Sequence, residues 1–357
     1  MAKPKVQFPD LGKISREFFD HFIYPRLGAP RADVLVGPRH GVDVGIVSIG
    51  NGQVMAITTD PIYIVPQYGW ERAAWFSWHI LASDVTTSGF PPAFVIPDFN
   101  LPISITEEEF EIVWRIWHQE SEKYGAAVVA GHTARYDGTD YPMVGGATFL
   151  AVGPEDRYLT PEMAQPGDRV VITKGAAIEA TGIFAATFPR TIERKLGEAI
   201  AEQGQALFYQ MSTVEDALTA VTVGVRHEGV TALHDATECG VLGGLYEVAE
   251  ASGVGLEIHR DRIPVPEAVE AITQAFGMDP YTSISEGTLI ITVRPHRVQA
   301  LLKALEQKGI LAAEIGEVLP AEEGRWLVTP EGRQPLEHPR VDPFWGAIRR
   351  AFEEGLS

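Results

Sequence analysis

The chain has 357 residues, 45% of them hydrophobic and 22% charged, which is the composition of an ordinary globular protein with room for two domains. Its formal charge of −19 argues against a nucleic-acid surface, because phosphate backbones attract clusters of Lys and Arg. A single cysteine, Cys239, excludes an internal disulfide framework, and no apolar run reaches the roughly 18 residues that span a bilayer, so we expect a cytoplasmic protein without membrane or nucleic-acid partners.

Residues 41–62, GVDVGIVSIGNGQVMAITTDPI, predict two apolar strands joined by a turn at Asn51-Gly52. Each strand carries one aspartate, Asp43 in the first and Asp60 in the second. A carboxylate among buried apolar residues needs a partner, because an unpaired buried charge is costly. The two aspartates therefore either cap turns at the strand ends or face a shared cation.

The segments that follow alternate between helix and strand patterns. Weakly polar side chains from Trp70 to Leu81 recur at helical spacing. The clearest helix is residues 106–125, in which Thr106 and Glu109 form a capping box and Gly125 closes the last turn. The other predicted segments of this half are a short strand over 91–99, a buried strand over 126–131, a polar loop over 131–142 and a strand over 145–153.

Residues 154–168, rich in Pro, Gly and charge, are the expected linker between two domains. The domains cover residues 35–153 and 169–330, with an N-terminal extension, 1–34, and a C-terminal tail, 331–357, that ends in a surface helix. This alternation of elements indicates layered α/β domains. In the second domain we expect a strand over 169–175, a long helical stretch, a helix starting near Asp235, a strand over 287–293, a helix over 297–309 and a strand over 314–318.

Common nucleotide and hydrolase motifs are absent from the sequence. It has no G-x-x-x-x-G-K-[ST] loop, no G-x-G-x-x-G and no G-x-S-x-G elbow. The ten histidines never pair with Cys or His at zinc spacing, so we expect no structural zinc site. Cys239 has no obvious His partner in sequence and is interpreted as a small buried residue rather than a nucleophile.

Polar groups recur at the ends of predicted elements in the first half. Three are carboxylates from separate segments, which can converge on one or two Mg²⁺ ions because Mg²⁺ favours oxygen ligands and keeps substrate phosphates in its shell. Taken singly, each aspartate is more simply a turn or cap residue. The four features are Asp43, Thr59-Asp60, Ser83-Asp84 and Gly131-His132-Thr133.

In the second half, HDATECGVLGG places Asp235 and Thr237 at a predicted helix start. The simpler interpretation is that one of them is the N-cap. The functional interpretation is that a glycine-rich helix start offers backbone N–H groups to an anion. Glu286 and Gly287 precede the next predicted strand and form either a tight turn or the wall of a site.

At these residues the chain resembles the AIR synthase-like (PurM-like) ATP-binding superfamily. GVDVGI resembles its Gly-x-Asp-x-Ala segment, TTDPI its Thr-Asp segment, LASDVTTSGFPP its Asn-Asp-x-x-x-x-Gly-x-x-Pro helix, and AGHTAR its Gly-Asp-Thr loop. The second half, from DATECGVLGG to SISEGTLIITV, is similar to the hydrogenase maturation (HypE) branch in order and spacing. The resemblance covers roughly residues 35–318.

The resemblance implies a two-domain α/β subunit whose N-terminal domain pairs with that of a second subunit in a β-barrel-like sheet, with ATP near that interface. It implies that Asp43, Asp60 and Asp84 hold Mg²⁺, and it gives catalytic roles to Asp43, Asp84, Asp235 and Glu286. The residues implied to bind the cofactor are Gly41, Thr59, Asp60, Ser83, Gly131, His132, Thr133, Thr237 and Gly287.

The chain departs from the family's pattern in three places. The HypE branch carries its substrate group on a C-terminal cysteine, where this chain has EEGLS. His132 replaces the aspartate of the Gly-Asp-Thr loop, which removes one expected metal ligand, and Ser83 replaces an asparagine. Selenophosphate synthetase is disfavoured because no Cys lies near the N-terminus, and thiamine-monophosphate kinase because its doubled aspartate is here Val42-Asp43.

The leading hypothesis is a homodimeric, ATP- and Mg²⁺-dependent HypE-like enzyme that activates an amide or carboxyl oxygen in hydrogenase metallocentre maturation or a related pathway. Its partners would be ATP, an amide- or carboxyl-bearing substrate and a metallocentre-maturation protein. One alternative is a small-molecule phosphotransferase of the thiamine-monophosphate kinase type. The other is a non-catalytic nucleotide-binding scaffold in the same maturation process.

Overall fold

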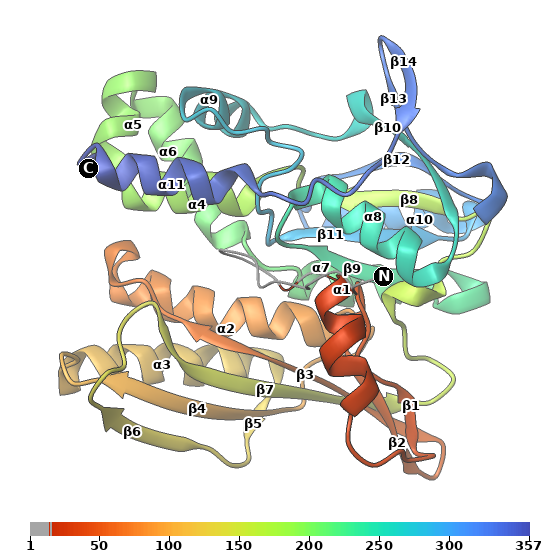
Figure 1. Ribbon diagram of the computed structural model, residues 1–357, viewed down its shortest axis with the longest axis horizontal. Coiled ribbons are helices and arrows are strands. Elements are labelled where there is room, and N and C mark those ends of the chain that lie inside the picture. Colours follow the sequence, from red (N-terminus) through yellow and green to blue (C-terminus); the bar gives the residue numbers. More distant parts are fainter. Residues whose placement is uncertain (1–13, 15) are drawn as a thin grey trace, which may run out of the picture.

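The computed structural model describes residues 14 and 16–357, which form two α/β halves stacked on one another (Figure 1). The lower half in the figure holds the first sheet with helices α2 (Trp70–Thr86) and α3 (Glu107–Tyr124), and the upper half holds the second sheet. The predicted α/β class is confirmed. Of the predicted N-terminal extension, residues 1–13 and 15 lie outside the described residues, and residues 16–18 form the short helix α1 (Arg16–Phe18).

The first sheet consists of β1 (Val34–Val36), β2 (Gly45–Gly50), β3 (Gln53–Tyr63), β4 (Phe94–Pro102), β5 (Ala127–Val128), β6 (His132–Tyr136) and β7 (Met143–Pro154). Its strand order is β1-β2-β3-β7-β4-β5, and β6 also pairs with β4. The pairs are antiparallel except that β5 and β6 run parallel to β4.

The predicted hairpin is confirmed. Asn51 and Gly52 join β2 to β3 with positive φ angles of 54° and 68°, as a two-residue turn with matching twist requires. One detail of the prediction is wrong, because Asp43 precedes β2 instead of lying within it. Asp60 does lie in β3, opposite Ala147 of β7.

Helix α3 begins and ends as predicted. The Thr106 hydroxyl accepts a hydrogen bond from the Glu109 N–H, and the Glu109 carboxylate accepts one from the Thr106 N–H, which completes the capping box. Gly125 follows the last turn with a left-handed φ of 77°. These local signals fixed the helix boundaries because they act within a few residues of each other.

Two buried tryptophans connect α3 to α2 through hydrogen bonds. The indole N–H of Trp78 donates to Ser121 Oγ at 3.0 Å, and that of Trp117 donates to Ser77 Oγ at 2.9 Å. Each tryptophan therefore buries its large apolar surface without leaving its polar atom unsatisfied. Both helices cover the same face of the first sheet (Figure 1).

Residues 126–142 differ from the prediction. The expected buried strand shrinks to β5, whose two residues are exposed. The expected polar loop contains β6, which pairs along its whole length with β4. Because β6 lies at an edge of the sheet and is largely exposed, it needs no alternating apolar pattern, and its polar sequence concealed it.

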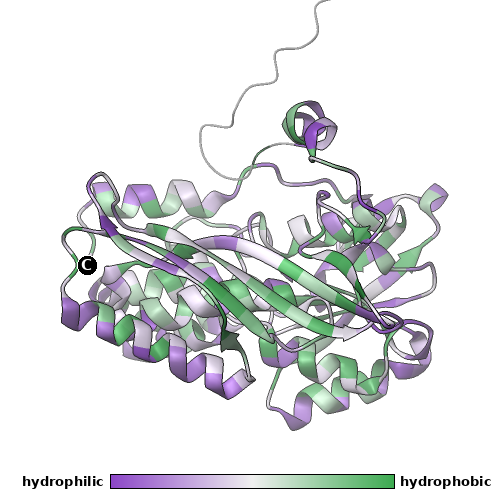
Figure 2. Cartoon of the chain, turned by 90° about the horizontal axis from the view of Figure 1, so that it is seen from below, coloured by the Kyte–Doolittle hydropathy of each residue, from purple (hydrophilic) through white to green (hydrophobic). Residues whose placement is uncertain are grey.

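Among the described residues, the other face of the first sheet carries no helix, and Figure 2 looks onto it. Its strands include apolar as well as polar residues (Figure 2). Exposed large apolar side chains of this sheet and its connections are Val34, Leu35, Ile49, Phe94, Ile103, Val128, Val129, Tyr136 and Met143.

The second sheet consists of β8 (Arg169–Thr173), β9 (Val230–Ala236), β10 (Gly255–His259), β11 (Thr288–Val293), β12 (Ala312–Leu319), β13 (Arg325–Thr329) and β14 (Gly332–Pro335). Its order is β14-β13-β10-β12-β8-β11-β9. Every residue of β9 and β11 is buried, so neither strand shows the alternation of a half-exposed strand, although β9 carries His234 and Asp235. The predicted strands near 169–175, 287–293 and 314–318 are confirmed.

The predicted long helical stretch is broken into four helices. Pro189 begins α5, and Gly197 with a φ of 90° separates α5 from α6. Among the described residues, no helix combines the length and apolar character needed to cross a membrane. The helices of the second half are α4 (Ile178–Thr187), α5 (Pro189–Leu196), α6 (Glu198–Ala206), α7 (Val214–Ala220), α8 (Gly240–Ser252), α9 (Glu267–Ala275), α10 (Val298–Gln307) and α11 (Pro343–Glu353).

The predicted surface helix of the tail is α11, and it is anchored firmly. Asp342 caps it by accepting from the Phe344 N–H, and a second oxygen of Asp342 accepts from the Cys239 N–H at 2.7 Å. The backbone of Ser357 exchanges two hydrogen bonds with Thr191 of α5. The tail is thus part of the core around α4 and α9.

His79 of α2 is a buried neutral group between the two halves. Its Nδ1 lies 2.7 Å from Ser212 Oγ and its Nε2 lies 3.1 Å from Glu120 Oε2. Burial lowers its pKa from 6.5 to about 4, outweighing the opposing effect of Glu120. At neutral pH the ring is therefore uncharged.

We expect His79 to make the protein less stable in mild acid. Because its folded pKa lies below its unfolded value, its contribution is complete above pH 6.5 and is lost as the pH falls toward 4. At about 1.4 kcal/mol per pKa unit, the loss amounts to roughly 3 kcal/mol. Urea unfolding at pH 7 and pH 4.5 should show a smaller acid loss in His79→Gln than in the unsubstituted protein. A His79 NMR resonance that titrates near pH 6.5 would contradict the assignment.

Candidate functional site

Carboxylates from both halves converge near the end of β9. Asp84, in the last turn of α2, has a pKa raised well above its usual value, by burial first and then by the charges of Asp60, Asp235 and Asp43. Three of these four groups come from the first half, and Asp235 comes from β9 of the second half. The predicted aspartates therefore lie close enough to act on one another. Thr58 Oγ1 also donates to Asp84 Oδ2, at 3.0 Å.

Glu286 extends this group from the turn before β11. Burial raises its pKa well above the usual range, and the charges of Asp235 and Glu179 raise it further, while hydrogen bonds from Ser83 and the Gly287 N–H oppose them. Its own N–H donates to Glu179 Oε2 at 3.0 Å. Glu179 was missed by the sequence analysis, because one acidic residue in the first turn of a helix such as α4 is ordinary. We call Asp43, Asp60, Asp84, Asp235 and Glu286 the carboxylate cluster.

Two predicted glycines stand beside this cluster where only glycine fits. Gly41 has a φ of 69°, and a Cβ there would lie 2.9 Å from the Glu247 carbonyl oxygen. Gly287 has a φ of 100°, and a Cβ there would lie 2.2 Å from the Gln210 carbonyl oxygen. Both glycines therefore allow two backbone segments to approach closely. Gly41 does so just before Asp43, and Gly287 does so directly after Glu286.

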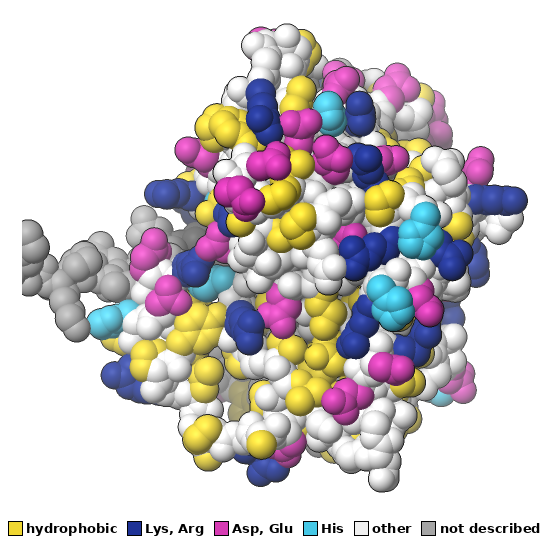
Figure 3. All heavy atoms as spheres, turned by 90° about the vertical axis from the view of Figure 1, so that its right-hand side faces the viewer, with side chains coloured by type: hydrophobic (Ala, Val, Ile, Leu, Met, Phe, Trp, Pro, Cys, Tyr) yellow, Lys and Arg dark blue, Asp and Glu magenta, His cyan; other side chains and the backbone are white. Residues whose placement is uncertain are grey.

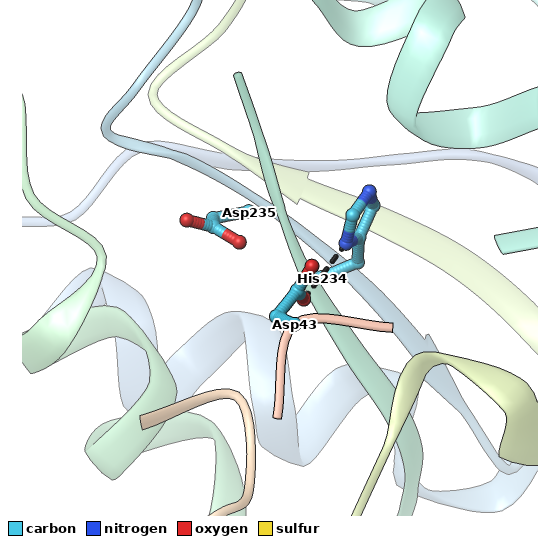
Figure 4. Close-up of side chains that lie close together, drawn as sticks. All are labelled: Asp43, His234 and Asp235. Atoms are coloured by element: carbon cyan, nitrogen blue, oxygen red, sulfur yellow. Dashed lines mark hydrogen bonds and ion pairs between the residues drawn. The ribbon is translucent and has the colours of Figure 1, made fainter. Parts of the chain in front are cut away.

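The donor set of the cluster fits a hard divalent cation such as Mg²⁺. Carboxylate oxygens are the ligands such cations take, and a cation among them relieves the repulsion that raises the pKa values of Asp84 and Glu286. Asp43, His234 and Asp235 each place one potential ligand atom within 4.8 Å of the others (Figure 4). The predicted metal set, Asp43, Asp60 and Asp84, therefore shares Asp43 with this group.

His234 is unsuited to bind a metal, although it belongs to that group. Its Nδ1 lies 2.8 Å from Asp43 Oδ2 and its Nε2 lies 3.0 Å from Glu247 Oε2, so both ring nitrogens are engaged. Burial alone lowers the pKa of His234, but the two carboxylates outweigh it and hold that pKa well above its usual value. His234 was not among the predicted site residues, although it directly precedes Asp235 in HDATECG.

The predicted helix start at Asp235 is wrong. Asp235 lies inside β9, and α8 begins only at Gly240, with Cys239 at the N-cap position and without a side-chain cap. Neither Asp235 nor Thr237 is therefore the N-cap. The Thr237 carbonyl instead accepts from the Ser285 N–H and the Gly240 N–H, which ties the loop after β9 to the turn that holds Glu286.

Gly131, His132 and Thr133 lie apart from the cluster within this chain. They are exposed, and His132 Nε2 lies 2.9 Å from the Tyr136 hydroxyl. Strands β7 and β4 separate β3, which carries Asp60, from β6. Three strand spacings of about 4.8 Å place the segment roughly 14 Å from Asp60 along the sheet. Sequence order alone suggested proximity because it does not reveal how many strands intervene.

Thr59 and Ser83 have partners outside the carboxylate cluster, and Ser83 also bonds to Glu286 within it. Thr59 is exposed in β3, and its Oγ1 donates to the Ala147 carbonyl at 3.1 Å. Ser83 is buried, and its Oγ accepts from the Thr213 N–H at 3.0 Å. Cys239 is buried and outside any disulfide, as predicted.

Residues 41–152 match the family model for AIR synthase related protein, N-terminal domain, and residues 165–328 match the one for its C-terminal domain. The chain belongs to the AIR synthase-related, PurM-like family. A selenide, water dikinase of Carboxydothermus hydrogenoformans is 26% identical over 342 residues, 85% of this chain and 90% of that protein. A carbamoyl dehydratase HypE of Azotobacter vinelandii is 27% identical over 252 residues, 70% of each chain.

Solved structures share the fold at lower identity. HypE in a HypE–HypF complex matches with a TM-score of 0.70 and 20% identity, over 90% of this chain and 98% of that one. HypE in complex with ATP matches with a TM-score of 0.63 and 20% identity, over 93% and 97%. ThiL complexed with AMPPCP and TMP matches with a TM-score of 0.63 and 19% identity, over 80% and 87%.

Proposed function

We propose that this protein is a cytoplasmic, ATP- and Mg²⁺-dependent enzyme of the HypE-like branch that activates an amide or carboxyl oxygen of its substrate, in hydrogenase metallocentre maturation or a related pathway. The observation that carries the proposal is the convergence of the carboxylate cluster from both halves, with the pKa of Asp84 and of Glu286 raised by burial first and then by their acidic neighbours. The likeness to HypE solved with ATP supports the choice of nucleotide.

In this proposal the carboxylates divide into two groups. Asp43, Asp60 and Asp84 hold Mg²⁺, which when bound neutralises the charge of the nucleotide's phosphate oxygens. Glu286 and Asp235, on the side of the second sheet, hold and move a proton during the reaction. The raised pKa of Glu286 supports this role, because a carboxyl group with such a pKa retains a proton closer to neutral pH.

The helix-free face of the first sheet supports the proposed homodimer. Exposed apolar side chains such as Phe94 and Met143 are of the kind that oligomer interfaces cover. The likeness to HypE in complex with HypF supports a second, metallocentre-maturation partner. Sedimentation of the purified protein at micromolar concentration measures the first of these associations directly.

There are two alternatives to the proposed HypE-like activity. The relative named selenide, water dikinase and the likeness to ThiL favour phosphoryl transfer to a small molecule. The second alternative is a nucleotide-binding scaffold without turnover, and the low overall identity to HypE relatives favours it. A screen with γ-labelled ATP separates the three functions, because a kinase yields a labelled small-molecule product, the proposed activation yields ADP and phosphate with a modified amide or acid, and a scaffold yields neither.

Mg²⁺-dependent ATP binding is the direct test of the proposal. In calorimetry at millimolar ATP and Mg²⁺ we expect binding heat that disappears without Mg²⁺ and weakens at least tenfold, or about 1.4 kcal/mol, in Asp60→Asn. Asp98→Asn is the matched control, because Asp98 is an exposed aspartate of the same sheet, on β4, which β7 separates from β3. Absence of heat from the unsubstituted protein would refute the proposal.

A further inference from the structure

A buried histidine joins the two halves at the edge of the carboxylate cluster. His234 is 3% exposed and lies in β9, between Asp43 of the first half and Glu247 of α8 (Figure 4 shows the Asp43 contact). The sequence separation of His234 and Asp43 is 191 residues, so the contact exists only in the folded chain.

With both neighbouring carboxylates ionised, both ring nitrogens of His234 donate. Ionised carboxylates only accept hydrogen bonds, and at 2.8 and 3.0 Å each nitrogen has one carboxylate oxygen as its partner. The ring therefore carries a positive charge between two negative ones. Such charge-assisted bonds are short and directional, so they restrict the orientation of the groups they join.

The surrounding backbone is shaped to admit this contact. The Gly41 backbone passes so close to Glu247 that a Cβ would meet its carbonyl oxygen at 2.9 Å. A Cβ on Gly244 of α8 would lie 3.3 Å from His234 Cδ2. Gly41 and Gly244 thus allow the Asp43 segment to pack closely against α8, with the imidazole of His234 enclosed between them.

We propose that His234 is a positioning residue that holds Asp43 by its Oδ2 atom and thereby directs the remaining carboxylate oxygen toward the cluster. The role in cation binding rests on the proposed function, whereas the link between the two halves does not. His234 itself touches neither the cation nor the nucleotide in this account. It acts through Asp43, and through Glu247 it fixes Asp43 to α8.

A pair of substitutions separates the two ring nitrogens. The side-chain amide of Asn reaches the place of Nδ1, and that of Gln reaches the place of Nε2. His234→Asn therefore keeps a donor for Asp43, and His234→Gln keeps one for Glu247. We expect His234→Gln to weaken Mg²⁺-dependent ATP binding at least tenfold in calorimetry, and His234→Asn to weaken it less than threefold. Equal losses in both variants, or a larger loss in His234→Asn, would overturn the positioning role.

A stability measurement tests the link itself, independently of nucleotide binding. In the metal-free protein we expect the Tm losses of His234→Gln and Asp43→Asn to be non-additive, so that the double variant loses about as much as the worse single variant. Strict additivity would overturn the link. If the unsubstituted protein binds no ATP, the proposed function fails, and non-additive Tm losses would still establish His234 as the connection between the two halves.

Discussion

Replacing Lys174 by Met is expected to lower the free energy of unfolding by roughly 3–5 kcal/mol. Lys174 Nζ donates to Asp216 Oδ2 at 2.8 Å, to the Ser212 carbonyl at 2.6 Å and to the Gly287 carbonyl at 3.0 Å. Removing it leaves the Asp216 side chain, which is 2% exposed, as an uncompensated buried charge. Urea unfolding at pH 7 measures the loss.

Lys308 provides the matched control for this substitution. Its Nζ lies 3.9 Å from Glu215 Oε2, and its side chain is 60% exposed. Lys308→Met should therefore cost less than about 1 kcal/mol, as exposed pairs do. Adding Asp216→Leu to Lys174→Met should restore part of the lost stability by removing the orphaned charge. Equal losses in the two lysine variants would contradict the assignment.

The second large effect is expected at Asp84, where one substitution should stabilise the fold and remove function. Asp84→Asn eliminates a carboxylate that burial and the charges of Asp60, Asp235 and Asp43 destabilise. We expect the metal-free variant to gain about 1–3 kcal/mol in unfolding free energy at pH 7. We also expect it to lose Mg²⁺-dependent ATP binding, because one of the proposed ligands becomes a neutral amide.

The raised pKa of Asp84 also determines how the stability of the metal-free protein changes with pH. The folded pKa of Asp84 lies above its unfolded value, so the metal-free protein loses stability as the pH rises from the usual aspartate range through the raised pKa. Asp84→Asn should reduce that loss, and Asp60→Asn should reduce it in part, because the charge of Asp60 helps to raise the pKa of Asp84. A metal-free Asp84→Asn protein that is less stable than its parent at pH 7 would contradict the account.

Local signals predicted much of the first half correctly. The positive φ angles at Asn51-Gly52 and the reciprocal bonds of Thr106 and Glu109 depend on neighbours a few residues away, so the sequence reveals them. Strand β6 was missed because an exposed edge strand needs no apolar alternation. The start of α8 was misplaced because Cys239 precedes it without a side-chain cap.

The candidate site could be predicted only in part. Each carboxylate of the cluster was visible as a polar residue at the end of an apolar segment, and the resemblance to a family grouped them. The partners that set their chemistry, Glu179 beside Glu286 and His234 beside Asp43, come from distant segments. These contacts depend on tertiary packing, within the second half for Glu179 and between the two halves for His234, which no spacing in the sequence encodes.

We propose that the carboxylate cluster binds a nucleotide through a divalent cation. A crystal grown with Mn²⁺ and a non-hydrolysable ATP analogue tests it most directly, because Mn²⁺ takes oxygen ligands and is located by its anomalous scattering. We expect an Mn²⁺ peak coordinated by oxygens of Asp43, Asp60 and Asp84 and by the analogue's phosphates. The contrary result would be a nucleotide bound without metal contacts to these residues, for instance in the 620 Å³ cavity lined by Trp75 and Tyr209.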